Sequence, residues 1–122
     1  MIWSDTNTPL HIIKERLIQF NKERDWGQYH NPRNLAMAVN VESAELLEPF
    51  LWCNDGGEKV LSHKRQAIEE EAADVLICLL NFCTQADIDL CAVAAKKIEK
   101  NARNYPIELA KGRSEKHTQL KE

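Results

Sequence analysis

The stretch EEEAADVLICLL, from Glu69 to Leu80, decides the fold prediction because it is apolar on several sides and acidic on one. In a helix, residues three apart lie only about 60° apart, so Glu71 and Asp74 would share a stripe with Val75. Carboxylates rarely enter an apolar interior unless a positive charge meets them. The stretch therefore predicts a buried helix that carries an acidic site on one face.

A second acidic pair with the same spacing lies earlier in the chain, at Glu42 and Glu45. It shares its helical stripe with apolar residues such as Leu46, and the rest of that helix is also largely apolar. Other acids nearby project to different sides: Glu48, Glu69 and Glu70. Helices that are apolar on several sides are buried on several sides. We therefore expect the two acidic pairs to face one another inside a helical bundle.

Four carboxylates brought together repel one another, so some must be protonated, paired with a basic residue or bound to a cation. No lysine or arginine lies on either stripe within one turn of the pairs. Oxygen ligands favour hard ions, which predicts Mg²⁺, with Mn²⁺ as a substitute. A di-iron centre would need Glu-x-x-His on two helices, and neither pair has a histidine at that spacing. A single ExxE pair is common on solvated helix faces, so the prediction depends on the coincidence of two.

The remaining sequence predicts an all-α fold, because glycines are few and apolar residues do not alternate as strands require. Thr8 is the expected N-cap of the first helix, with Pro9 at its first position. The expected helices are Pro9 to about Arg24, Pro32 to about Phe50 or Cys53, about Ser62 to Gln85, and Asp87 or Asp89 to before Tyr105. We expect a single domain over residues 1–122, with a polar tail over about 107–122 that is extended or partly helical.

Composition excludes several classes of protein. The chain has 122 residues and a net charge of -3 with no basic stripe, which argues against binding to a nucleic acid polymer. No apolar run approaches the roughly 20 residues that span a bilayer. The N-terminal stretch MIWSDTNTPL lacks the charge order of a signal peptide. A cytoplasmic protein without a membrane partner is therefore expected.

The acidic motifs also resemble a known family. ExxE on one helix and ExxD on the next, separated by a loop, is similar to the all-α nucleoside triphosphate pyrophosphatases of the MazG-like group. Further segments resemble its dCTP pyrophosphatase branch and occur in the same order: ERDWGQYHNPRNLAMAV, PFLW, EEEAADVLICLL and KKIEKNARNYPIELAKG. The resemblance covers about residues 10–120.

This resemblance implies a MazG-like four-helix bundle assembled as an oligomer, with a homotetramer favoured over a dimer. It implies Mg²⁺-dependent hydrolysis of a nucleoside triphosphate substrate, preferably a deoxynucleotide such as dCTP, to a monophosphate and pyrophosphate. Such an activity would clear unwanted nucleotides from the pool. Two rivals stay open: a pyrophosphohydrolase of another phosphorylated metabolite, such as phosphoribosyl-ATP, and a helical oligomer that binds nucleotides without turnover.

Site residues are carried over by position. The resemblance implies four Mg²⁺ ligands: Glu42, Glu45, Glu71 and Asp74. Among them, Glu45 is the expected general base. It implies contacts to phosphate or sugar from Lys97, Asn101, Arg103 and Tyr105. It places the base between Trp26 and Trp52, with His30 close by. A solvated terminal helix and two core tryptophans are the structural alternatives for these last two groups.

Two positions depart from the dCTP-specific relatives. Cys78 stands where several of them carry tyrosine, and Leu17 where some carry histidine. Both changes touch the expected base and sugar pocket. The reaction type is therefore better supported than a preference for cytosine.

Overall fold

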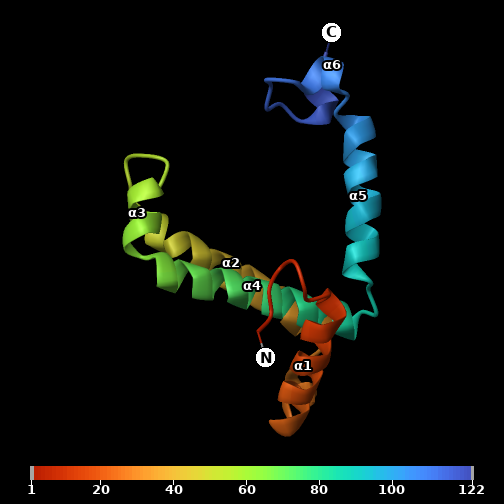
Figure 1. Ribbon diagram of the computed structural model, residues 1–122. Helices are drawn as coiled ribbons and strands as arrows, with labels where there is room; N and C mark the ends of the chain where they lie inside the picture. The colour runs from red at the N-terminus through yellow and green to blue at the C-terminus, as the bar shows by residue number, and fades with distance from the viewer. Residues whose placement is uncertain (1, 122) are drawn as a thin grey trace. The chain divides into compact units, whose positions relative to one another are not determined.

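The computed structural model describes residues 2–121, and all regular secondary structure in that range is helical (Figure 1). The chain divides into two compact units, one that ends at Ile88 and one that begins at Asp89. The first unit contains α1 (Leu10–Glu23), η1 (Trp26–Tyr29), α2 (Pro32–Leu47), η2 (Glu48–Phe50), α3 (Glu58–His63) and α4 (Arg65–Gln85). The second contains α5 (Leu90–Asn104), α6 (Ile107–Ala110) and η3 (His117–Gln119). Met1 and Glu122, the two ends of the predicted single domain, lie outside the described residues.

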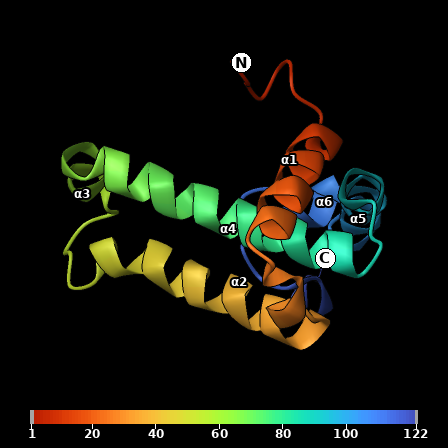
Figure 2. The ribbon, with the colours of Figure 1, turned by 90° about the horizontal axis from the view of Figure 1, so that it is seen from below.

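The helices α2 and α4 lie side by side along most of their length (Figures 1 and 2). The first begins where the sequence predicts, because the side-chain oxygen of Asn31 accepts a hydrogen bond of 2.8 Å from the backbone N–H of Asn34. Leu35 on α2 and Ile68 on α4 are buried. This helix pair supports the acidic residues described below.

Two predicted helix starts are wrong. Pro9 has an extended backbone (φ -62°, ψ 150°), so α1 begins at Leu10, and the hydroxyl of Thr8 caps no helix N–H but accepts from the N–H of Ser4 at 3.2 Å. The helix expected from Ser62 is two helices, because the backbone at Lys64 leaves the helical region (φ -115°, ψ 29°) between α3 and α4.

The predicted end of the second helix is also too late. Its α-helical part stops at Leu47, and the chain continues as the 3₁₀ turn η2 to Phe50. Pro49 lies in that turn, where its missing N–H removes an α-helical hydrogen bond. The expected distortion at this proline is confirmed.

The helix α1 packs against the C-terminal half of α4 (Figure 2). The side chain of Lys14 donates a 2.8 Å hydrogen bond to the carbonyl of Ile88, just beyond the end of α4. In the last turn of α1, Asn21 donates a 3.1 Å hydrogen bond to Asn81 of α4. Leu80 is 0% exposed and Cys83 is 2% exposed in this half of α4. These contacts fix α1 and the following turn η1 on α4.

One side of α2 stays uncovered within this chain. Met37, Val41 and Leu47 are each more than half exposed, at 59%, 53% and 59%. Their spacing places them on the side of the helix away from the buried Leu35. The sequence predicts that α2 is buried on several sides, whereas in a single chain one apolar side of α2 is exposed.

The second unit is a helix followed by a folded tail. The side chain of Asp89, the second of the two expected caps, accepts a 3.1 Å hydrogen bond from the N–H of Ala92 at the start of α5. In the tail, Arg113 binds the carbonyl of Lys121 at 2.8 Å and the carboxylate of Glu115 at 3.3 Å. The tail is therefore partly helical, as one of the two alternatives expected.

Within residues 2–121, no single helix has both the length and the apolar composition needed to cross a membrane, although α4 and α5 taken together reach that threshold.

Leu80→Ala tests the packing of α1 on α4. Because Leu80 is fully buried, we expect the substitution to lower the free energy of unfolding by about 2–5 kcal/mol. Urea denaturation followed by circular dichroism measures this loss. The matched control is Leu76→Ala on the same helix, where the side chain is 37% exposed and the expected loss is under about 1 kcal/mol. Equal losses in the two variants would contradict the packing.

Candidate metal centre

Three carboxylates converge between α2 and α4. Glu42 and Glu45 from α2 and Glu71 from α4 each offer an oxygen, and these oxygens all lie within 4.8 Å of one another. All three side chains are half-buried. The pairing of the two helices brings the two acidic stripes together, so three of the four predicted ligands meet. We call these three residues the acidic cluster.

The fourth predicted ligand, Asp74, lies outside the acidic cluster and is exposed. It is nevertheless near, because its charge raises the pKa of both Glu42 and Glu71. Three residues after Glu71 on α4, it stands at the solvent edge of the cluster.

The acidic cluster lacks a compensating positive charge. Burial is the main cause that raises the pKa of Glu42, followed by contact with Glu45 and by the charges of Asp74 and Glu71. The pKa of Glu71 is raised by burial first and next by the charge of Glu45. Among residues 2–121, the ion pairs join Arg24 to Glu23, Arg65 to Glu69 and Arg113 to Glu115. None of these pairs involves the cluster.

Two oxygen atoms of the acidic cluster are buried without a hydrogen-bond partner: Oε2 of Glu42 and Oε2 of Glu71. A buried acceptor of this kind costs free energy unless a donor or a cation meets it. A donor set made only of carboxylate oxygens suits Mg²⁺ or Mn²⁺. The residues present therefore fit a hard divalent ion held between α2 and α4.

Cys78 follows Asp74 by one helical turn and is half-buried. Burial raises the pKa of its thiol, and the charges of Glu42, Asp74 and Glu45 raise it further. The thiol therefore stays neutral at physiological pH and leaves a small side chain where the resemblance expects tyrosine.

The two predicted base-stacking residues differ in their surroundings. Trp26, in η1, is 44% exposed and packs edge-on against Phe20, with ring centroids 5.6 Å apart and planes at 73°. The guanidinium of Arg24 lies 3.6 Å from the centre of the same Phe20 ring. Trp52 is 95% exposed and has a left-handed backbone (φ 67°). Within this chain, the ring of Trp52 is therefore presented to solvent.

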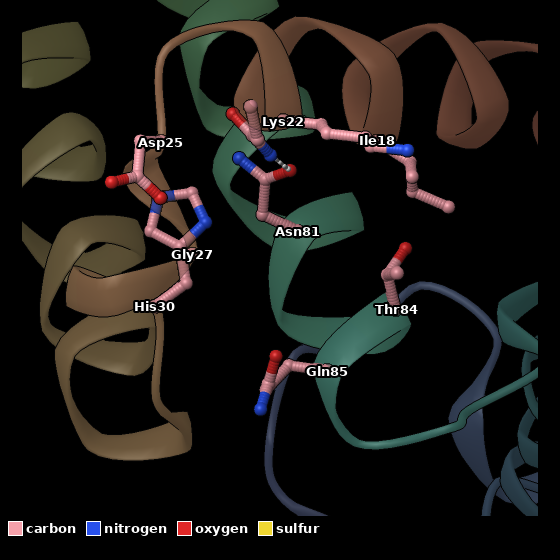
Figure 3. A pocket seen from close by; sticks show the side chains of 9 residues that line it. Ile18, Lys22, Asp25, Gly27, His30, Asn81, Thr84 and Gln85 are labelled. Carbon is pink, nitrogen blue, oxygen red and sulfur yellow. Dashed lines mark hydrogen bonds between the residues drawn. The ribbon is translucent and has the colours of Figure 1, made fainter.

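His30 is half-buried in the wall of a cavity of about 330 Å³ (Figure 3). The cavity is formed by the end of α1, the turn η1 and the end of α4. Its wall also contains Asn21 and Asn81, which no sequence motif singles out and which only the helix packing brings together.

The predicted phosphate and sugar contacts belong to the second unit. Lys97, Asn101 and Arg103 are exposed on α5, and Tyr105 follows the last residue of that helix. The Tyr105 ring packs edge-on against His117 of the tail, with centroids 5.6 Å apart. The spacing of four residues places Lys97 and Asn101 on one side of α5, whereas Tyr105 lies beyond the helix with a non-helical backbone (φ -122°, ψ 68°).

Glu71→Gln tests the charge strain in the acidic cluster. The raised pKa of Glu71 means that the folded state holds this proton more tightly than the unfolded state, where the ordinary value is 4.5. That contribution to stability is present below pH 4.5 and is lost as the pH rises through the higher folded-state pKa. At neutral pH without a divalent ion, we therefore expect Glu71→Gln to melt a few degrees above the wild type.

Differential scanning fluorimetry measures the melting temperature of each protein, first with EDTA and then with Mg²⁺. Mg²⁺ should stabilise the wild type and should have little effect on Glu71→Gln. The matched control is Glu69→Gln, because Glu69 is exposed in a surface pair with Arg65 and should not change the melting temperature. A lower melting temperature for metal-free Glu71→Gln would show that the carboxylate is not strained.

Comparisons with known proteins agree with the all-α fold. The MazG-like family model matches residues 37–120. The human protein named dCTP pyrophosphatase 1 is 40% identical over 114 residues, which cover 91% of this chain and 67% of the relative. The rat protein of the same name is 37% identical with the same coverage. The crystal structure of a pyrophosphatase from Archaeoglobus fulgidus DSM 4304 aligns with a TM-score of 0.78 and 39% identity, over 87% of this chain and 99% of that one. The chain belongs to the MazG-like family.

Proposed function

We propose that this protein hydrolyses nucleoside triphosphates, with dCTP or a related deoxynucleotide as the preferred substrate, to a monophosphate and pyrophosphate. The observation that carries the proposal is the acidic cluster with its two unpartnered buried oxygens. Membership of the MazG-like family and the names of the relatives support it. Its role would be to remove unwanted nucleotides from the pool.

In this proposal, Glu42, Glu45 and Glu71 hold Mg²⁺ between α2 and α4, and the exposed Asp74 completes the ligand set at the solvent edge. When bound, Mg²⁺ would neutralise the phosphate charge and stabilise the leaving pyrophosphate. Glu45 is the proposed general base, which takes a proton from the attacking water. The contact of Glu45 with both Glu42 and Glu71 places it at the centre of the cluster.

The rest of the substrate is assigned to residues near η1 and η2 in the first unit and to residues of the second unit. Trp26 and Trp52 stack on the base, with His30 in the wall of the adjoining cavity. Contacts to phosphate or sugar are assigned to Lys97, Asn101, Arg103 and Tyr105. Exposed aromatic and cationic side chains are suited to these roles, since a base is bound by stacking and a phosphate by charge.

We also propose that the active protein is an oligomer of this chain, a homotetramer by resemblance, with a dimer as the smaller alternative. The support is the uncovered apolar side of α2, where Met37, Val41 and Leu47 are more than half exposed. Apolar surface of this kind is normally covered by a partner.

The direct test combines a nucleotide panel with two substitutions. Wild-type protein with Mg²⁺ is assayed against all common ribo- and deoxynucleoside triphosphates, with chromatographic detection of the monophosphate and pyrophosphate. Glu45→Gln and Asp74→Asn should each lower kcat by at least about a hundredfold, because each removes a group that acts on the reacting phosphate or on its metal. EDTA should abolish turnover of the wild type.

The folding control is the melting temperature of each variant, which should not fall below that of the wild type, and its size in solution, which should match that of the wild type. Full turnover in both variants would refute the assigned metal site. Binding of nucleotides without release of pyrophosphate from the wild type would support the non-catalytic rival.

Trp52→Ala separates substrate binding from stability. Because Trp52 is 95% exposed, its removal should leave the free energy of unfolding within about 0.5 kcal/mol of the wild type. If the ring stacks on the base, nucleotide affinity should fall about fivefold or more, as measured by calorimetry with a non-hydrolysable triphosphate. Trp52→Phe is the matched control, since it keeps an aromatic face. Unchanged affinity of Trp52→Ala would remove this residue from the base site.

A further inference from the structure

Tyr105 stands at the junction between α5 and the tail of the second unit. Its backbone N–H still donates to the carbonyl of Asn101 at 2.8 Å, but its dihedral angles are no longer helical (φ -122°, ψ 68°). The next residue is Pro106, and a proline keeps the residue before it out of the helical region. The backbone of Tyr105 is therefore well defined, whereas its side chain is 36% exposed and is not enclosed by a core.

The ring of Tyr105 is held by a contact with the tail. It packs edge-on against the imidazole ring of His117, with centroids 5.6 Å apart and planes at 81°. Aromatic pairs favour this arrangement, because the positive edge of one ring meets the negative face of the other. Within residues 2–121 the hydroxyl of Tyr105 has no hydrogen-bond partner. The contact therefore restricts the ring and leaves the hydroxyl available to a ligand.

The tail reaches Tyr105 because the chain turns back after α6. Gly112 has a left-handed backbone (φ 76°), a conformation that L side chains rarely adopt. The N–H of Arg113 then donates to the carbonyl of Ala110, the last residue of α6, at 3.0 Å. Figure 1 shows α6 and the tail at the C-terminal end of α5. The turn at Gly112 therefore directs the tail towards the end of the helix that Tyr105 follows.

The side chain of Arg113 closes the segment that carries His117. Its guanidinium donates to the carbonyl of Lys121 at 2.8 Å and pairs with the carboxylate of Glu115 at 3.3 Å. His117 begins the 3₁₀ turn η3 between these two anchor points. The bonds of Arg113 therefore limit the positions that His117 can take.

These contacts are suited to positioning a side chain more than to stabilising the fold. Arg113 and His117 are both exposed, and exposed pairs contribute little to the free energy of unfolding. Their effect is on conformation, because a tyrosine ring at a surface otherwise samples several rotamers. A binding group that is already in place loses less entropy when its ligand arrives. The contact with His117 therefore preorganises Tyr105.

We propose that His117 is a positioning residue for nucleotide binding. The tail, closed by Arg113, holds the ring of Tyr105 so that its hydroxyl donates a hydrogen bond to the phosphate or sugar of the substrate. His117 itself does not touch the substrate. The inference rests on the proposed function, because it takes Tyr105 as a substrate contact.

Steady-state kinetics of the full-length protein with dCTP and Mg²⁺ test this role. A contact made equally in the ground state and the transition state affects KM and not kcat. We expect His117→Ala to raise KM about fivefold, with kcat within about twofold of the wild type. His117→Phe keeps a ring against Tyr105 and should restore the wild-type KM. The matched control is Thr118→Ala, on the exposed neighbour in η3, which should behave as the wild type. A KM raised equally by alanine and phenylalanine, or by neither, would overturn the inference.

Arg113→Gln tests the closure of the tail. The substitution removes the pair with Glu115 and the bond to the carbonyl of Lys121, but it changes neither ring. We expect KM to rise about threefold, with kcat within about twofold of the wild type. Lys116→Gln is the matched control, because it removes a positive charge from the same exposed tail. A wild-type KM in Arg113→Gln would refute the role of the closed tail.

A double-mutant cycle on binding shows whether His117 acts through Tyr105. Calorimetry measures the affinity for a non-hydrolysable triphosphate in the wild type, His117→Ala, Tyr105→Ala and the double variant. We expect His117→Ala to weaken binding about fivefold by itself and by less than about 1.5-fold in the Tyr105→Ala background. Equal losses in both backgrounds would overturn the inference. So would an unchanged affinity of Tyr105→Ala.

The cycle is independent of turnover. If the wild type releases pyrophosphate but the cycle shows no coupling, the inference fails and the proposed function stands. If the wild type shows the coupling but releases no pyrophosphate, the proposed function fails and the positioning of Tyr105 by His117 stands.

Discussion

The convergence of Glu42, Glu45 and Glu71 within 4.8 Å is the constraint on which the rest of the structure depends. Like charges at this distance, partly removed from water, oppose folding unless something compensates them. The apolar contacts between α2 and α4, including the buried Leu35 and Ile68, hold the carboxylates together despite that cost. The pair of helices therefore stores an unfavourable charge arrangement that a divalent cation relieves. A cation gains most by binding where the carboxylates of the protein alone lack a compensating partner.

The helix α4 links the acidic cluster to the cavity beneath η1. Its first half carries Glu71 and Asp74, and its second half carries Asn81 on the same stripe. The packing of α1, fixed by the bonds from Lys14 and Asn21, sets the wall opposite that second half. One helix therefore fixes the distance between the acidic cluster and the α4 wall of this cavity. A substrate with an anionic end and a hydrogen-bonding end would span both.

Sequence periodicity predicts that the acidic pairs meet, but it predicts neither the helix break at Lys64 nor the exposure of Asp74. The spacing of the acidic pairs on apolar helices predicts that they meet, and the Asn31–Pro32 and Asp89 signals predict two helix starts. The break at Lys64 carries no proline or glycine, so local rules miss it. Helical periodicity equally fails to separate Asp74, which is exposed, from Glu71, which is half-buried, because burial depends on the neighbouring helix. The Asn21–Asn81 bond joins residues 60 positions apart, beyond the reach of any local pattern.

Charged groups and neutral amides contribute differently to the recognition of a nucleotide. Charges act strongly on phosphates of any nucleotide, so a cation held by the acidic cluster would act on the phosphates but would carry no information about the base. Neutral amides contribute less free energy but are directional, and a donor in place of an acceptor changes the sign of the interaction. Cys78, one helical turn after Asp74, adds no charge to α4 beside the acids, because burial and the nearby carboxylates raise the pKa of its thiol.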